Sequence, residues 1–252
     1  MEIEGNRMLG WFHRLGSPKT FFGMSQSWPK TFGLLSLLLL ALGTVWGLLF
    51  APPDYQQGHS VRIMYVHVPA AVVAQSCYLI MAISSAVFLI WNMKLADWAA
   101  KSMAPIGASL AFLVLITGAI WGKPTWGTWW VWDARLTSTL VLLLLYLGII
   151  ALRNALEEKG NDGRPCAVLA LVGLVNLPII KYSVDWWFTL HQPASFTLTE
   201  NPKMPPEMWI PLLLMAAGYY LFVFSVWTSR IRNEIISRER KTAWAKTWAG
   251  SQ

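Results

Sequence analysis

The residues most able to form a binding site are grouped in the middle of the chain. Five tryptophans lie within the twelve residues from Trp121 to Trp132, and Asp133 and Arg135 follow them. We call residues 121–135 the tryptophan segment. Tryptophan is large and apolar, and its indole N–H needs a partner when the ring is buried. Five such rings at a helix edge would make a flat apolar platform, which suits a membrane interface or a large planar ligand lying there.

A simpler explanation is an aromatic belt, because tryptophan is enriched where membrane helices leave the hydrocarbon. Composition alone favours the belt. Two details favour a specific site instead. The tryptophans are contiguous rather than spread over several helix ends, and they are mixed with residues typical of a shaped loop rather than a continued helix: Gly122, Pro124, Gly127 and Thr128.

Two histidines are candidate metal ligands. His67 stands at the start of an apolar run, and His191 stands in an aromatic segment further along the chain. Neutral imidazole is the commonest metal ligand, and two imidazoles on opposite sides of an aromatic platform would suit axial ligation of a haem iron. The alternative is two unrelated interfacial histidines, each bonded to a backbone carbonyl, and the residues alone leave both open. His59 has polar neighbours and ranks behind His67, and His13 lies in the N-terminal arm.

Asp133 and Arg135 stand at the start of a predicted helix. An acidic residue there is favoured by the helix dipole and can cap free N–H groups. Arg135 opposes the dipole, so its guanidinium could pair with Asp133 or with a carboxylate such as a haem propionate. Arg62 and Lys123 are possible helpers, and the sequence does not separate these roles.

The elements that must hold these residues are membrane helices. Of the 252 residues, 55% are hydrophobic and 13% are charged, whereas soluble domains carry about twice that charged fraction. A backbone in lipid must satisfy its own hydrogen bonds, so apolar runs near twenty residues long predict helices. We expect an all-α polytopic membrane protein, a single membrane domain over residues 1–252, with six spans at roughly 31–50, 70–91, 103–121, 136–152, 166–183 and 208–228.

Lysine and arginine orient this predicted bundle. With the N-terminus in the cytoplasm, fifteen of the twenty lysines and arginines fall on the cytoplasmic side. The positive-inside rule then places both termini in the cytoplasm. Loops 51–69, 122–135 and 184–207 face outward, so His67 and His191 share the side of the tryptophan segment. The net charge of +7 reflects this orientation and an attraction to anionic membrane lipid, and no basic domain for nucleic acid is present.

Several other functions lack support in the sequence. It contains no Gly-x-x-x-x-Gly-Lys-Ser/Thr run, so no ATP site is expected. The predicted spans are nearly free of charge, so no proton or ion path is indicated. Cys77 and Cys166 form no Cys-x-x-Cys pair and are predicted at different membrane depths, which argues against a zinc site or a disulfide. Pro105 and Pro178 are positions where the third and fifth spans can kink.

The run from Trp126 to Thr137, WGTWWVWDARLT, resembles the WWD signature of haem-handling membrane proteins. Within that group, the six predicted spans and the flanking His67 and His191 are similar to the CcmC family, the haem-delivery subunits of bacterial cytochrome c maturation. The resemblance covers the whole chain in length, helix count, topology and histidine placement.

The resemblance implies a multi-pass protein of the bacterial inner membrane whose tryptophan segment faces the periplasm. It implies that haem b binds there, with His67 and His191 as axial ligands of the iron. The other haem-contacting residues would be Trp121, Trp126, Gly127, Thr128, Trp129, Trp130, Trp132, Asp133 and Arg135. The implied partners are the periplasmic haem chaperone CcmE, the ATPase CcmA, and the membrane subunits CcmB and CcmD.

Three functions compete at this point. The resemblance favours a haem-presenting binding protein that is not an enzyme. A permease that carries haem across the bilayer would need a polar or gated path, which the sequence does not indicate. A haem lyase of the same signature group would resemble a larger protein with more helices and histidines, whereas this chain has four histidines.

Overall fold

The computed structural model describes residues 16–159, 163–191 and 204–249, and within them the chain is helical with no β-strand. The arm that contains His13 and the part of the third outward loop at 192–203 lie outside the described residues. Six helical segments are long and apolar enough to cross a membrane, and each predicted span lies within one of them. The predicted class, an all-α polytopic membrane protein, is confirmed.

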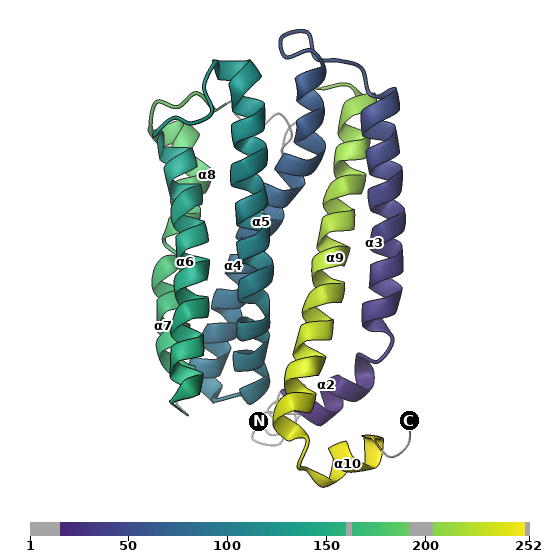
Figure 1. Ribbon diagram of the computed structural model, residues 1–252, viewed down its shortest axis with the longest axis vertical. Helices are drawn as coiled ribbons and strands as arrows, with labels where there is room; N and C mark the ends of the chain where they lie inside the picture. Colours follow the sequence, from purple (N-terminus) through teal and green to yellow (C-terminus); the bar gives the residue numbers. More distant parts are fainter. Residues whose placement is uncertain (1–15, 160–162, 192–203, 250–252) are drawn as a thin grey trace, which may run out of the picture.

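The spans run side by side along the long axis of the molecule (Figure 1). In chain order they are α3 (Trp28–Val45) with its π-helical end η1 (Trp46–Phe50), α4 (Met64–Trp91) preceded by the 3-10 helix η2 (His59–Ile63), α5 (Lys94–Trp126), α6 (Ala134–Glu158), the pair α7 (Arg164–Gly173) and α8 (Asn176–Trp186), and α9 (Pro206–Glu239). Two short helices, α2 (Pro18–Met24) and α10 (Ala243–Ala249), lie at one end of the bundle, which we call the terminal end. The opposite end, where α5 ends and α6 begins, is the tryptophan end.

Most helices extend beyond the apolar runs that predicted them. α5 spans Lys94–Trp126, whereas the prediction was 103–121, and α9 continues to Glu239. α4 begins at Met64, so His67 lies inside a helix and not in the loop before it. The physical reason is that hydropathy detects only the part of a helix that suits hydrocarbon, while the backbone hydrogen bonds continue into the polar ends.

The fifth span is two helices joined by a short turn. Pro178 has no N–H to donate to the carbonyl of Leu174, and that carbonyl accepts from the N–H of Leu177 at 3.1 Å instead. The helix of the fifth span is therefore interrupted between Gly173 and Asn176, close to Pro178. The side-chain amide of Asn176 donates to the backbone carbonyl of Ser138, 2.9 Å away, and so fastens α8 to α6.

Glycines let the large side chains of the core approach closely. Tyr146 of α6 donates its phenol hydrogen bond to the carbonyl of Ala74 in α4, at 2.8 Å. A Cβ built on Gly107 of α5 would lie 2.1 Å from Cζ of Tyr146, and one built on Gly173 would lie 2.0 Å from the Tyr78 hydroxyl. The two tyrosine rings pack edge to face with centroids 5.1 Å apart. These contacts hold α4, α5, α6 and α7 around one core.

Helix α3 packs on α9 and leaves its other face uncovered. Ser36 donates to the carbonyl of Gly218 at 2.8 Å, and Gly43 lies against Met215. On the outer face, Leu34 and Leu37 are 69% and 66% exposed. A continuous apolar face of this kind suits contact with lipid, as expected of an integral membrane protein.

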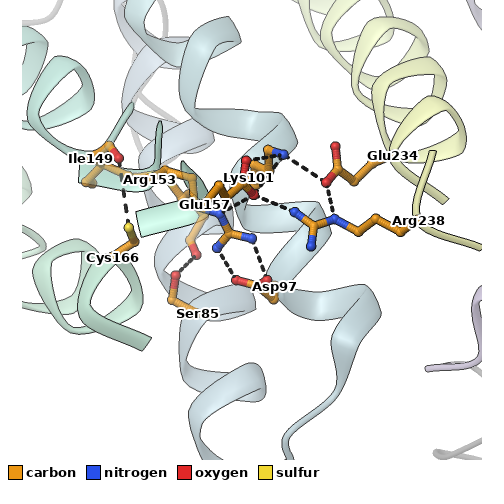
Figure 2. A network of polar contacts seen from close by, with 10 residues as sticks. Ser85, Asp97, Lys101, Ile149, Arg153, Glu157, Cys166, Glu234 and Arg238 are labelled. Atoms are coloured by element: carbon orange, nitrogen blue, oxygen red, sulfur yellow. Dashed lines mark hydrogen bonds and ion pairs between the residues drawn. The ribbon is translucent and has the colours of Figure 1, made fainter. Parts of the chain in front are cut away.

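Six charged side chains form an ion cluster at the terminal end of the bundle (Figure 2). They are Asp97 and Lys101 of α5, Arg153 and Glu157 of α6, and Glu234 and Arg238 of α9. Arg153 donates two hydrogen bonds to the Asp97 carboxylate, at 2.5 and 2.6 Å. Lys101 lies 2.9 Å from Glu157 and 2.8 Å from Glu234, and Arg238 contacts the same two carboxylates. These charges lie outside the predicted spans, but the longer helices carry them, and they fasten α9 to α5 and α6.

Replacing Arg153 with Met should strongly destabilise the fold. The side chains of Arg153 and Asp97 are only 7% and 12% exposed, and an unpaired buried charge costs about 3–5 kcal/mol. Thermal unfolding in detergent measures the loss. An Arg153→Met/Asp97→Asn double variant should recover much of it, because no buried charge is left unpaired. Arg238→Ala is the control, since its side chain is 37% exposed and such pairs contribute about 0–1 kcal/mol. A single Arg153→Met variant as stable as Arg238→Ala would contradict the prediction.

Candidate functional site

Several helix ends meet at the tryptophan end of the bundle (Figure 1). Ring contacts connect side chains from these elements. His67 of α4 packs edge to face on Trp121 of α5, with centroids 5.6 Å apart. Trp126, the last residue of α5, has its ring centroid 4.9 Å from that of His191, which follows α8. The structure thus brings both candidate ligands into contact with the tryptophan segment.

The tryptophan segment is partly helical. α5 continues through Pro124 to Trp126, so the predicted loop over 121–135 is shortened to residues 127–133. The expectation that glycine and proline exclude a helix here was wrong, because Pro124 removes a single donor close to the end of a 33-residue helix. Gly127 ends the helix with a φ of +78°, a left-handed conformation that glycine adopts without strain.

The five tryptophans do not form one flat platform. Trp130 and Trp132 pack edge to face, with an interplanar angle of 78°. Trp121 is half-buried and donates from Nε1 to the side-chain carbonyl of Gln57 at 2.7 Å. Trp129 and Trp132 are 57% and 75% exposed. The segment therefore has two sets of rings. Trp121 and Trp126 pack against the histidines, whereas Trp129 and Trp132 face away from the protein.

His67 is held against α5 through one ring nitrogen. Its Nδ1 lies 3.0 Å from the hydroxyl of Thr117. Gly118 leaves room for the ring, since a Cβ there would be 3.0 Å from Cε1 of His67. No hydrogen bond to Nε2 occurs among the described residues, and Nε2 is not among the buried polar atoms that lack a partner. The ε nitrogen of His67 is therefore accessible.

His191 is placed by a carboxylate and a threonine. One oxygen of Asp133 accepts from the N–H of Leu136 at 2.7 Å and caps α6, as the sequence analysis anticipated for this residue. The other oxygen accepts from the hydroxyl of Thr189, and the Thr189 oxygen accepts from the N–H of His191 at 3.1 Å. Asp133 thus connects the start of α6 with the segment that carries His191.

The His191 imidazole is neutral at pH 7. Burial lowers its pKa to about 4, and the positive charge of Arg135 acts in the same direction, against the opposing effect of Asp133. Nδ1 of His191 is buried without a hydrogen bond, 3.9 Å from Asp133, while Nε2 is accessible. Neutral imidazole is the form that binds a metal.

Arg135, Lys123 and Arg62, the candidate partners for a haem carboxylate, make different hydrogen bonds. Arg135 donates to the hydroxyl of Ser183 at 3.1 Å and to the carbonyl of Lys181 at 3.2 Å, so it fastens α6 to α8. Lys123 donates to the carbonyl of Gly127 at 3.0 Å. Arg62 donates through Nη2 to a backbone carbonyl at 3.3 Å, but its Nε is buried without a partner. Of these three cations, Arg62 is the one with a buried donor still to be satisfied.

Three residues of this site were missed by the sequence analysis: Thr117, Gly118 and Thr189. Two of them touch His67 from α5, and their spacing from Trp121 along one helix could have suggested a shared face. Thr189 contacts Asp133 across 56 residues of sequence, and no local pattern indicates that pairing. It depends on how α8 packs beside α6.

Comparison with known proteins supports one family. The profile described as CcmC, heme exporter protein C, matches residues 11–246. The chain is 46% identical to the heme exporter protein C of Haemophilus influenzae over 96% of this chain and 98% of that protein. It is 45% identical to the protein of the same name from Escherichia coli K12, over 92% of this chain and 94% of that protein. The chain belongs to the CcmC family. A CcmC relative from Bradyrhizobium diazoefficiens is similar at 46% identity over 89% of this chain.

In this CcmC chain, Asp133→Asn should separate the two roles of the carboxylate. Asparagine keeps an oxygen for the cap of α6, but its amide nitrogen cannot accept from the Thr189 hydroxyl. The thermal midpoint should change little, while amide hydrogen exchange at His191 becomes faster. Asp133→Ala removes both contacts and should cost a further cap energy of about 1 kcal/mol. Unchanged exchange at His191 in both variants would exclude a role for Asp133 in placing this histidine.

Proposed function

We propose that this CcmC protein binds haem b at the tryptophan end and presents it to the periplasmic haem chaperone CcmE during cytochrome c maturation. The observation that carries the proposal is the pair His67 and His191. Each contacts the tryptophan segment, and each keeps its ε nitrogen accessible. The names of the relatives, heme exporter protein C, agree with a role in haem delivery.

The residues at the tryptophan end fit a haem. A haem takes axial ligands on its iron, apolar contacts on its ring and hydrogen bonds on its propionates. Two neutral imidazoles supply the ligands, and tryptophan rings supply the apolar contacts. The described residues also include three buried donors without partners at the tryptophan end, Nε1 of Trp130, Nε of Arg62 and the hydroxyl of Tyr65. Such donors are costly when unsatisfied, and a carboxylate can satisfy them.

The chain's own residues perform the holding and the presentation. Bound haem would supply an iron, and the imidazoles of His67 and His191 would be its ligands. Asp133 and Thr189 restrict where His191 can lie, and Trp121 restricts the His67 ring. The outward rings of Trp129 and Trp132 offer a partner protein a large apolar contact beside the site.

The proposed location is the bacterial inner membrane, with the tryptophan end in the periplasm. Among the described residues, most lysines and arginines lie toward the terminal end, and under the positive-inside rule this supports a cytoplasmic terminal end. The proposed partners are the ATPase CcmA and the membrane subunits CcmB and CcmD. An ATPase partner is required for any ATP-driven step, since this chain has no ATP-binding motif.

The two competing functions have less support. A permease needs a polar path, whereas the charges of the ion cluster are paired with one another at the terminal end. A haem lyase of the larger kind is disfavoured because the H. influenzae relative matches over 98% of its own length. Haem delivery without catalysis is the function that the site supports best.

Substituting either proposed ligand should change the haem spectrum. His67→Ala and His191→Ala each remove one imidazole, so the purified proteins should hold less haem and lose the six-coordinate spectrum. The measurement is absorption at matched protein concentration in detergent. His59→Ala is the control, because His59 is exposed, and it should behave as the wild type. A six-coordinate spectrum in both ligand variants would exclude this ligand assignment.

Substituting the outward tryptophans should impair delivery more than binding. Trp129→Ala/Trp132→Ala should retain the haem spectrum, because neither ring contacts a histidine among the described residues. Loading of CcmE should fall by about fivefold or more, since each aromatic contact contributes about 0.5–1.5 kcal/mol. The measurement is haem covalently bound to CcmE. Trp186→Ala is a matched control, also an exposed tryptophan at 57%. Normal loading by the double variant would leave only a membrane-anchoring role for these rings.

A further inference from the structure

The hydroxyl of Thr117 has a defined donor role. It donates to the backbone carbonyl of Leu113 at 2.7 Å, with the carbonyl of Val114 3.3 Å away. A threonine hydroxyl carries one proton, and here that proton is directed at the helix backbone. Towards Nδ1 of His67, 3.0 Å away, the Thr117 oxygen can therefore only accept.

The contact determines which nitrogen of His67 carries the proton. Among the described residues, Nδ1 thus faces one acceptor and no donor, so the stable neutral form has its proton on Nδ1. In a neutral imidazole the other nitrogen then holds the lone pair. For His67 that nitrogen is Nε2, which is the accessible one.

We propose that Thr117 is a positioning residue, which fixes the tautomer of His67 so that Nε2 is ready to bind a metal before haem arrives. This inference rests on the proposed function of His67 as a haem ligand. Metal-binding histidines generally donate their second N–H to a fixed acceptor, which sets the ring orientation and raises ligand basicity. Here the acceptor is a hydroxyl on the neighbouring span.

The second histidine has no equivalent acceptor. Nδ1 of His191 makes no hydrogen bond, and its distance of 3.9 Å from Asp133 is too long for one. The two ligands are therefore unequal. His67 has its tautomer set by α5, whereas His191 has its backbone placed by Thr189 and its ring tautomer left unset.

A first test measures the tautomer without haem. Haem-free protein labelled with ¹⁵N in its histidine rings should give, for His67, a neutral imidazole protonated on Nδ1; His67→Ala assigns the signal. Thr117→Val keeps the side-chain shape but removes the hydroxyl, and should introduce the second tautomer or shift the Nδ1 signal. Thr117→Ser should restore the wild-type signal. A His67 ring protonated on Nε2 in the wild type, or a spectrum unchanged by Thr117→Val, would overturn the proposal.

A second test replaces the ligand by two isomers of equal size. Haem-loaded His67→Gly is titrated with 4-methylimidazole, which retains an N–H, and with 1-methylimidazole, which has none. We expect His67→Gly to prefer 4-methylimidazole over 1-methylimidazole, and this preference should be about two- to tenfold larger than the same preference measured in His191→Gly. That factor is the effect of one hydrogen bond. Adding Thr117→Val to His67→Gly should reduce this excess. Equal preference in the two glycine variants would overturn the role of Thr117.

The two hypotheses fail separately. If His67→Gly keeps the six-coordinate spectrum with no added imidazole, His67 is not the ligand and the proposed function fails at this residue. If that variant loses the spectrum but shows no excess preference for 4-methylimidazole, His67 remains a ligand and only the inference about Thr117 fails. The labelled haem-free protein decides the tautomer in either case.

Discussion

The arrangement of the tryptophan end depends on the hydrogen bonds of the Asp133 carboxylate. One oxygen caps α6 and the other accepts from Thr189, so a single side chain starts a membrane helix and places the segment that carries His191. Asp133 is buried, where its charge must be compensated by hydrogen bonds. Those hydrogen bonds come from the elements that form the site. Its position after five tryptophans therefore has a structural cause.

The two ends of the bundle use polar groups differently. At the terminal end, charges pair with charges across α5, α6 and α9, and the ion cluster fixes these helices relative to one another. At the tryptophan end, hydroxyls and the Asp133 carboxylate hold the histidines, and the buried donors on Trp130, Arg62 and Tyr65 lack partners in the described part of the chain. Between the ends, glycines admit tyrosine rings and keep the spans close. The ion cluster holds the helices together at the terminal end, and unpaired hydrogen-bond donors remain at the tryptophan end. This arrangement suits a protein that holds a ligand at one end.

The two proposed haem-binding histidines are held differently: His67 is firmly held and His191 is less restrained. His67 lies inside a 28-residue helix, next to Trp121 and the hydroxyl of Thr117. His191 lies beyond the end of α8, held through its backbone and Asp133. A delivery protein must bind its cargo and also release it, and unequal restraint of two ligands is compatible with both. The outward tryptophans beside the loop provide the surface on which a recipient could approach.

The sequence determined the class and the six spans, and it singled out His67, His191 and the tryptophan segment as candidates for the site. Long hydrophobic runs indicate membrane spans directly. The WWD run resembles the CcmC family, and the profile of that family matches the chain. The sequence could not give the helix ends, because polar residues that extend a helix carry no hydropathy signal. It gave neither the ion cluster nor the contacts of Thr117 and Thr189, since each joins residues about 50 or more positions apart. Such pairs exist only when helices pack, so tertiary structure alone decided which polar groups meet and which ring nitrogen of His67 stays free.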